Sequence, residues 1–195
     1  PSFLDMVSYA SQKRIYTATS TNAHYLNEKN AKQTILSGLD RLIISIDGTS
    51  QSTYESYRKG GDLQKVINGT KEIIKWKKQL NSNTPHVIFQ FLVVKPNEHQ
   101  IDEVKDLAKK LGVDEVKFKT AQIYDYEKGN ELIPTIEKFS RYFKNGDGNY
   151  HIKNELYNHC WKLWHSSVIT WDGNMIPCCF DKDAKYQMGS LKKNT

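Results

Sequence analysis

Three cysteines near the end of the chain are the residues whose type and spacing best suit metal chemistry. Cys160 is followed by twelve residues, Gly173, four residues and Cys178, with Cys179 directly after it. A hairpin turn at Asp172-Gly173 would return the chain so that Cys178 approaches Cys160, as a polynuclear cluster or a tetrahedral metal requires. Because two thiolates make only half of such a site, further ligands would come from nearby side chains: Cys179, His159, His165 and Asp181.

The alternative to a metal site is a set of buried free cysteines beside a hairpin. A structural disulfide is disfavoured, because an odd, clustered set of cysteines in a chain with no recognisable secretion signal indicates metal binding or redox chemistry. The cysteines therefore predict a metal-binding or redox-active region in the last part of the chain.

The composition predicts a folded protein with a sizeable core. Of 195 residues, 38% are hydrophobic and 26% are charged, and no stretch approaches the roughly 20 apolar residues that span a bilayer. The net charge of +6 comes largely from lysines such as Lys65, Lys71, Lys75 and Lys78, which fall opposite apolar residues at helical spacing. We expect solvated helix faces, no nucleic-acid partner and no membrane partner. Since the chain opens at Pro1 without a signal peptide, we also expect a truncated, cytoplasmic protein.

Upstream of the cysteines, the chain alternates short β-branched runs with longer amphipathic segments. The predicted strands are residues 15–19, 41–47, 87–94 and 115–120. The predicted helices are 3–12, 28–37, 62–80 and 98–111, with a short additional turn at 52–57. Asn97, with Gln100 three positions later, and Asp62 are expected to cap helix starts, and Gly112 a helix end. This alternation predicts an α/β fold of parallel strands joined by right-handed crossovers, either barrel-like or doubly wound.

In both of these folds, ligands bind at the carboxyl ends of the strands. Residues 19–22, 47–48, 95–97 and 119–122 should therefore rim one site. The polar, glycine-containing stretch at 145–149 is a plausible boundary, which gives a first domain of residues 1–145 and a small second domain of residues 146–195.

The cysteine-bearing region resembles the auxiliary iron–sulfur domain, known as SPASM, of radical S-adenosylmethionine (SAM) enzymes. The similarity rests on Cys160-Trp161, on SVITWDGNMIPCCFD at residues 167–181 and on Met188-Gly189. The spacing fits the opening of that family, whose remaining cysteines lie further downstream and are absent here. The resemblance implies that Cys160, Cys178 and Cys179 are metal ligands and that this chain supplies only part of a cluster site.

The segment RLIISIDG at residues 41–48, followed by Tyr54, Arg58 and a helix, is similar to the fourth strand and following helix of the radical SAM partial barrel. In that family the strand serine contacts the sugar of SAM and a following arginine contacts its methionine carboxylate, which implies these roles for Ser45 and Arg58. Asp47 shares a strand face with Ser45, and a guanidinium is a natural bidentate partner of a carboxylate.

Residues 19–22 are similar to the end of the third family strand, where polar groups face the cofactor, which adds Asn22 to the SAM-binding set. The alternative is that Asn22 caps the turn to the next helix. Further polar residues in or beside the later strands could touch adenine or substrate: Gln90, Lys95, Lys119 and Gln122.

The resemblance implies a partial TIM-like (β/α) barrel, here of about four parallel strands, followed by the cysteine domain. It also implies SAM, a catalytic [4Fe–4S] cluster, an auxiliary iron–sulfur cluster and an electron donor such as flavodoxin or ferredoxin. The expected function is that of an oxidoreductase which makes a 5′-deoxyadenosyl radical for hydrogen abstraction from a peptide or small-molecule substrate.

Two family motifs are absent: the three-cysteine motif and the glycine-rich motif that binds the SAM amino group. We therefore expect this fragment to be inactive by itself and to self-associate through an open sheet edge at residues 15–19. The alternatives are a zinc-binding α/β-barrel enzyme and a non-catalytic binding module that docks a partner protein.

Overall fold

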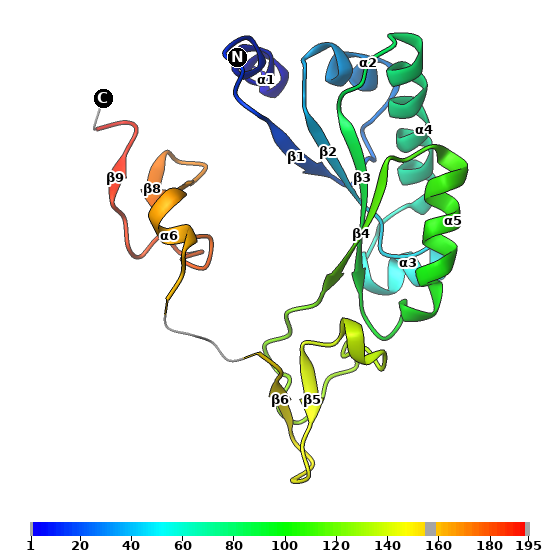
Figure 1. The fold of residues 1–195 in the computed structure, drawn as a ribbon, viewed down its shortest axis with the longest axis vertical. Helices are drawn as coiled ribbons and strands as arrows, with labels where there is room; N and C mark the ends of the chain where they lie inside the picture. Colours follow the sequence, from blue (N-terminus) through cyan, green and yellow to red (C-terminus); the bar gives the residue numbers. More distant parts are fainter. Residues whose placement is uncertain (1, 155–158, 194–195) are drawn as a thin grey trace. The chain divides into compact units, whose positions relative to one another are not determined.

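The computed structural model describes residues 2–154 and 159–193. The chain forms two compact units, Pro1–Lys153 and Asn154–Thr195. Figure 1 shows the first unit as an α/β assembly and the second as a smaller, strand-containing segment. Among the described residues, no helix is both long and apolar enough to cross a membrane.

A four-stranded parallel sheet organises the first unit. Its strands are β1 (Ala18–Thr21), β2 (Arg41–Ser45), β3 (His86–Val93) and β4 (Glu115–Thr120), in that spatial order. The predicted parallel α/β class is confirmed. The first strand begins later than predicted, because Ile15 and Tyr16 are exposed and the Thr17 amide donates to the Asp40 carboxylate (2.7 Å) instead of continuing a strand.

The helices of the first unit follow the predicted order. They are α1 (Phe3–Gln12), α2 (Glu28–Leu36), α3 (Gln51–Tyr57), α4 (Leu63–Gln79) and α5 (Ile101–Leu111), the last preceded by a 3₁₀ turn, η1 (Glu98–Gln100). The Asp62 side chain caps α4 by accepting from the Lys65 amide, and Gly112 ends α5 in the left-handed conformation, both as predicted. Asn97 occupies the N-cap position of η1 as predicted, but its side chain makes no capping bond and instead bridges two strand ends.

One face of the sheet carries the core. Figure 1 shows α2, α4 and α5 along the same side of the sheet. Alternate strand residues such as Leu42, Ile44, Phe89 and Phe91 are buried there, in one cluster with the apolar residues of α4. The four lysines of α4 that were expected in solvent are exposed: Lys65, Lys71, Lys75 and Lys78. Because strand side chains alternate, the intervening residues line the opposite face of the sheet.

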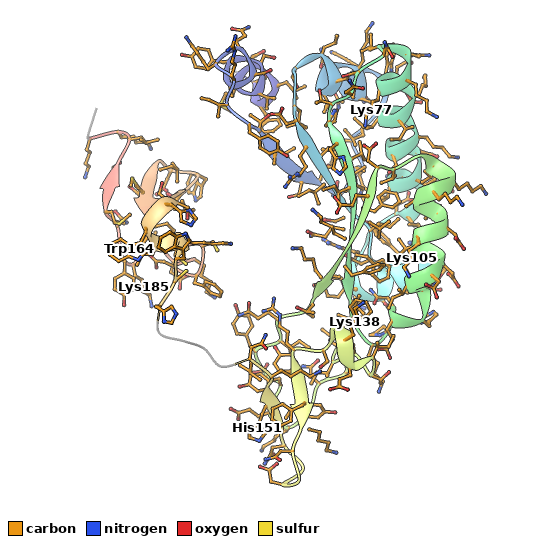
Figure 2. The ribbon with its side chains drawn as sticks, viewed as in Figure 1. Lys77, Lys105, Lys138, His151, Trp164 and Lys185 are labelled. Carbon is orange, nitrogen blue, oxygen red and sulfur yellow. The ribbon has the colours of Figure 1, made fainter. Side chains whose placement is uncertain are left out.

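The chain beyond β4 contains a hairpin that the sequence did not predict. After the turn η2 (Glu137–Phe139), β5 (Tyr142–Lys144) pairs antiparallel with β6 (Tyr150–Ile152). Residues 145–149, predicted as a domain boundary, form the turn between these strands, and the compact unit continues to Lys153. A polar, glycine-containing stretch suits a tight turn as well as a linker. Figure 2 labels His151 on this hairpin.

The second unit contains α6 (Lys162–His165) and an antiparallel sheet of β7 (Val168–Ile169), β8 (Asn174–Ile176) and β9 (Gly189–Ser190). The predicted hairpin at Asp172-Gly173 is present, with Gly173 at a φ of 86° that favours glycine. The strand before the turn is shorter than the predicted 167–171. The Thr170 hydroxyl donates to the Asp172 carboxylate and the Asn174 carbonyl and accepts from the Asn174 amide, so Thr170 belongs to the turn.

Candidate functional site

A polar row crosses the face of the sheet opposite the core. Ser45 on β2 is in register with Gln90 on β3, and Gln90 is in register with Lys117 on β4. All three side chains are partly exposed, and the neighbours of Ser45 and Gln90 along their strands are buried on the core side. The Lys117 ammonium lies 3.3 Å from the Glu115 carboxylate on the same strand face. The row therefore offers a hydroxyl, an amide and an ammonium to a ligand that lies across the strands.

The carboxylate of Asp47 holds Arg58 beside the end of β2. Asp47 is 1% exposed, and its Oδ2 accepts from the Arg58 Nε at 2.6 Å, while its Oδ1 accepts from the Leu92 amide at 2.7 Å. The Arg58 side chain is 37% exposed, and among the described residues only its Nε takes part in an ion pair. The terminal nitrogens of the guanidinium are thus left to bind a ligand, whereas the aspartate is shielded from one.

Two buried amides fix the loop that joins β2 to α3. The Asn97 side chain donates to the Asp47 carbonyl (3.0 Å) and the Leu92 carbonyl (2.9 Å) and accepts from the Val94 amide (2.8 Å). The Gln100 side chain accepts from the Thr49 amide at 2.8 Å. Because Asn97 is fully buried, these bonds satisfy polar groups that water cannot reach. The ends of β2 and β3 are therefore tied together where the site lies.

Gly48 and Gly61 let the backbone pack against Tyr54 next to Arg58. A Cβ atom at position 48 would lie 2.4 Å from the Tyr54 nitrogen, and one at position 61 would lie 2.6 Å from the Tyr54 ring. Tyr54 is 1% exposed, and this burial raises the pKa of its hydroxyl above the ordinary value of 10.0. The tyrosine is therefore a neutral structural residue that supports α3 and the arginine at its end.

Asn22 follows β1 at the same edge of the sheet. Its side-chain oxygen accepts from the His24 amide at 3.2 Å, and the side chain is exposed. This bond caps the turn that leads to α2, in agreement with the alternative interpretation of Asn22, while Asn27 caps the helix itself. The structure thus places Asn22 in a turn beside the end of β2, since neighbouring parallel strands end at one edge. Within the described parts of the chain, its side chain makes no hydrogen bond to Ser45, Asp47 or Arg58.

The three cysteines are free thiols in the second unit. Cys160 and Cys179 are exposed and Cys178 is half-buried, with its sulfur accepting from the Phe180 amide at 3.3 Å. Their chemistry fits an iron–sulfur cluster, which thiolates bind. Within residues 2–154 and 159–193, however, no three side chains of the His, Cys, Asp and Glu types are arranged to hold a metal ion. The present residues thus supply donors of the right kind, but not a complete set.

The structure brings Asp47 and Arg58 into direct contact and places Ser45 two residues before that aspartate. It adds two residues that the sequence reasoning did not assign to the site, Lys117 and Gln100. Asn97, which was expected at the rim of the site, is buried there and bridges two strand ends. Lys117 follows from the strand register, which the sequence does not reveal. Asn97 was expected near the site because it follows a predicted strand end. Its side chain, however, was interpreted as a helix cap.

The first unit is an α/β domain with an arginine fixed at a strand end. The second unit carries three free cysteines, whose side chains are suitable metal ligands. Residues 160–195 match the SPASM family, described as an iron–sulfur cluster-binding domain. The chain is also 23% identical over 214 residues to a protein of Methanococcus maripaludis named a probable GTP 3′,8-cyclase, with 97% of this chain and 68% of the relative covered. Together these matches support a radical SAM protein with a SPASM domain, which confirms the resemblance inferred from the residues.

Proposed function

We propose that the chain is part of a radical SAM oxidoreductase that acts on a peptide or small-molecule substrate. When bound, a [4Fe–4S] cluster supplies the electron that cleaves SAM and yields a 5′-deoxyadenosyl radical for hydrogen abstraction. The observation that carries this proposal is the SPASM match, which begins at Cys160 and includes Cys178 and Cys179. The mixed α/β fold of the first unit fits a radical SAM enzyme, and we propose that its sheet is part of a (β/α) barrel.

In this proposal the open face of the sheet binds SAM. Ser45 lies on that face and can donate its hydroxyl to the sugar, and the terminal nitrogens of Arg58 can bind the methionine carboxylate in a bidentate manner. Asp47 acts through Arg58, because both of its oxygens are already bonded inside the protein. Asn22 stands at the neighbouring strand end, from which its amide could reach the same ligand.

The second unit, which contains the SPASM match, would hold an iron–sulfur cluster in part through Cys160, Cys178 and Cys179. This cluster would accept an electron from the substrate or bind it directly, while a small redox protein such as flavodoxin or ferredoxin supplies electrons to the catalytic cluster. The three-cysteine motif that holds a catalytic cluster is absent from the printed sequence. We therefore expect no 5′-deoxyadenosine from this chain alone when it is given SAM and a reductant.

Anaerobic iron–sulfur reconstitution tests the proposal. The oxidoreductase of which this chain is proposed to be part would be reconstituted in parallel as the wild type and as the variants Cys160→Ala, Cys178→Ala and Ser167→Ala, with iron and zinc counted per chain. Each cysteine change should lower the iron content, whereas the exposed Ser167→Ala control in the same unit should not. Iron that is unchanged in both cysteine variants would contradict the proposal, and zinc in place of iron would favour the zinc-binding alternative.

A further inference from the structure

A hollow of about 330 Å³ opens beside the β5–β6 hairpin of the first unit. It is bordered by the residues after β3, by the loop around Pro134 and by the hairpin itself. In Figure 1 this hairpin, drawn in yellow, continues from the carboxyl end of β4, the edge at which parallel sheets bind ligands. The volume falls within the range of small-ligand pockets.

Three lysines from three segments line this hollow. Lys95 follows β3, Lys144 ends β5, and Lys153 follows β6. Glu137 is the one acidic residue of the lining, so three ammonium groups against one carboxylate leave a net charge of +2. The Lys153 ammonium donates to the Glu137 carbonyl at 2.7 Å and lies 3.7 Å from its carboxylate. Lys95 and Lys144 have no ion-pair partner among the described residues.

A buried tyrosine anchors the hairpin that carries Lys144 and leads into Lys153. The Tyr142 hydroxyl donates to the Ile123 carbonyl at 2.9 Å and accepts from the Ile123 amide at 2.7 Å. Its ring stacks on Tyr126 with 4.6 Å between centroids, and the Ser140 hydroxyl donates to the Tyr142 carbonyl. Since the backbone of the hairpin is fixed by these bonds, a ligand would not have to order it, which favours binding.

We propose that this hollow, the lysine pocket, binds the negatively charged groups of a small anionic molecule. Like charges that face one hollow repel each other, and an anion between them relieves that repulsion. Phe143 and Tyr150 offer aromatic surface beside the lysines, which suits a ligand that joins an anionic group to an apolar part. The chemistry shared by the candidate ligands is a doubly charged group, either a phosphate or a pair of carboxylates. The inference does not depend on SAM or on a cluster.

Isothermal titration calorimetry of the metal-free full chain tests this inference, with inorganic pyrophosphate and citrate as the two probes. Lys95→Gln and Lys144→Gln should each weaken binding of the preferred probe about tenfold, because each removes a charge-assisted hydrogen bond. The matched control is Lys109→Gln, an exposed lysine of α5 outside the lining. Circular dichroism of each variant checks that its secondary structure is unchanged.

Tighter binding of pyrophosphate would identify a phosphate site, and tighter binding of citrate a carboxylate site; either result supports the lysine pocket. The inference is overturned if neither probe binds, or if Lys109→Gln weakens binding as much as the pocket variants do. Because no step requires SAM or iron, the outcome is separate from that of the reconstitution experiment.

Discussion

At the scale of single residues, the carboxylate of Asp47 decides how Arg58 can be used. Asp47 is only 1% exposed and bonds both a guanidinium and a backbone amide. It is a fixed anchor, because loss of either bond would leave a buried polar group without a partner and would cost free energy. The arginine is held through Nε, so its two terminal nitrogens keep a set direction. Ser45, the last residue of β2, lies two residues earlier and keeps its hydroxyl on the open face.

Asp47→Asn should weaken SAM binding even though Asp47 touches no ligand in our proposal. The asparagine cannot accept both hydrogen bonds, so Arg58 loses its anchor, and the free energy of unfolding should fall by about 1.5–3 kcal/mol. Arg58→Gln should weaken SAM binding as well. Equilibrium dialysis with labelled SAM, with the exposed Asp106→Asn as the control, measures both effects. Unchanged SAM affinity in Arg58→Gln would remove this arginine from the proposed site.

The residue types of the candidate site could be inferred from the sequence, but their grouping could not. Ser45, Arg58 and the cysteines follow from local motifs. The row of Ser45, Gln90 and Lys117 depends on the register between strands that lie far apart in the sequence, and no local pattern records that register. The use of Asn97 also depends on tertiary contacts, because the same asparagine suits a helix cap and a strand bridge.

At the scale of elements, the positions of the strands and helices were largely predictable because apolar residues repeat with clear periods. The strand 115–120 and the helix 3–12 agree with β4 and α1 at both ends. The β5–β6 hairpin was missed, since its strands have only three residues each and too few alternations to show a period. The same hairpin forms one side of the lysine pocket.

Asp114 joins three of these elements. Its carboxylate accepts from Lys77 of α4 at 2.6 Å and from the Val87 amide of β3 at 2.7 Å, and it stands between α5 and β4. Figure 2 labels Lys77 on α4. Burial by itself raises the pKa of this carboxyl, but the bonds to Lys77 and Val87 outweigh burial and hold the pKa below the ordinary 3.8.

A carboxyl whose pKa is lower in the folded state stabilises the fold above its unfolded pKa, and this contribution is lost as the pH falls through the lower folded value. The chain should therefore lose stability below about pH 4, where unfolded aspartate takes up its proton. Urea unfolding at pH 5.5 and pH 3 measures this. Asp114→Asn should be less stable at pH 5.5 and should lose less on acidification, while equal losses in both proteins would contradict the assignment.

At the scale of the whole molecule, the two units differ in how much core they possess. The first unit buries a continuous apolar cluster that includes Phe89, Phe91 and Val66. Among the described residues of the second unit, Ile176 is the one buried hydrophobic residue, at 3% exposed. A segment this short rarely folds stably on apolar burial alone, and a bound metal is a common way to stabilise one.

Limited trypsin digestion of the metal-free chain should therefore cut the second unit first, at exposed lysines such as Lys182, Lys185 and Lys192. A fragment close to Pro1–Lys153 should accumulate, which mass spectrometry identifies. As a control, Phe89→Ala should speed digestion of the first unit alone, since the loss of a buried phenylalanine costs about 3–5 kcal/mol. Equal cutting of α4 and the second unit in the wild-type chain would show that the two units do not differ in stability.

Because the second unit buries few residues, its tryptophans are exposed, and this affects the fluorescence of the protein. Of the four tryptophans, Trp161, Trp164 and Trp171 lie in this unit, at 78%, 80% and 99% exposed, while Trp76 lies on α4. An indole in water emits at longer wavelength than one inside a protein, so most of the fluorescence of this chain reports on the part that carries the cysteines. Tryptophan fluorescence is thus an intrinsic probe of the cluster binding that we assign to the iron–sulfur region.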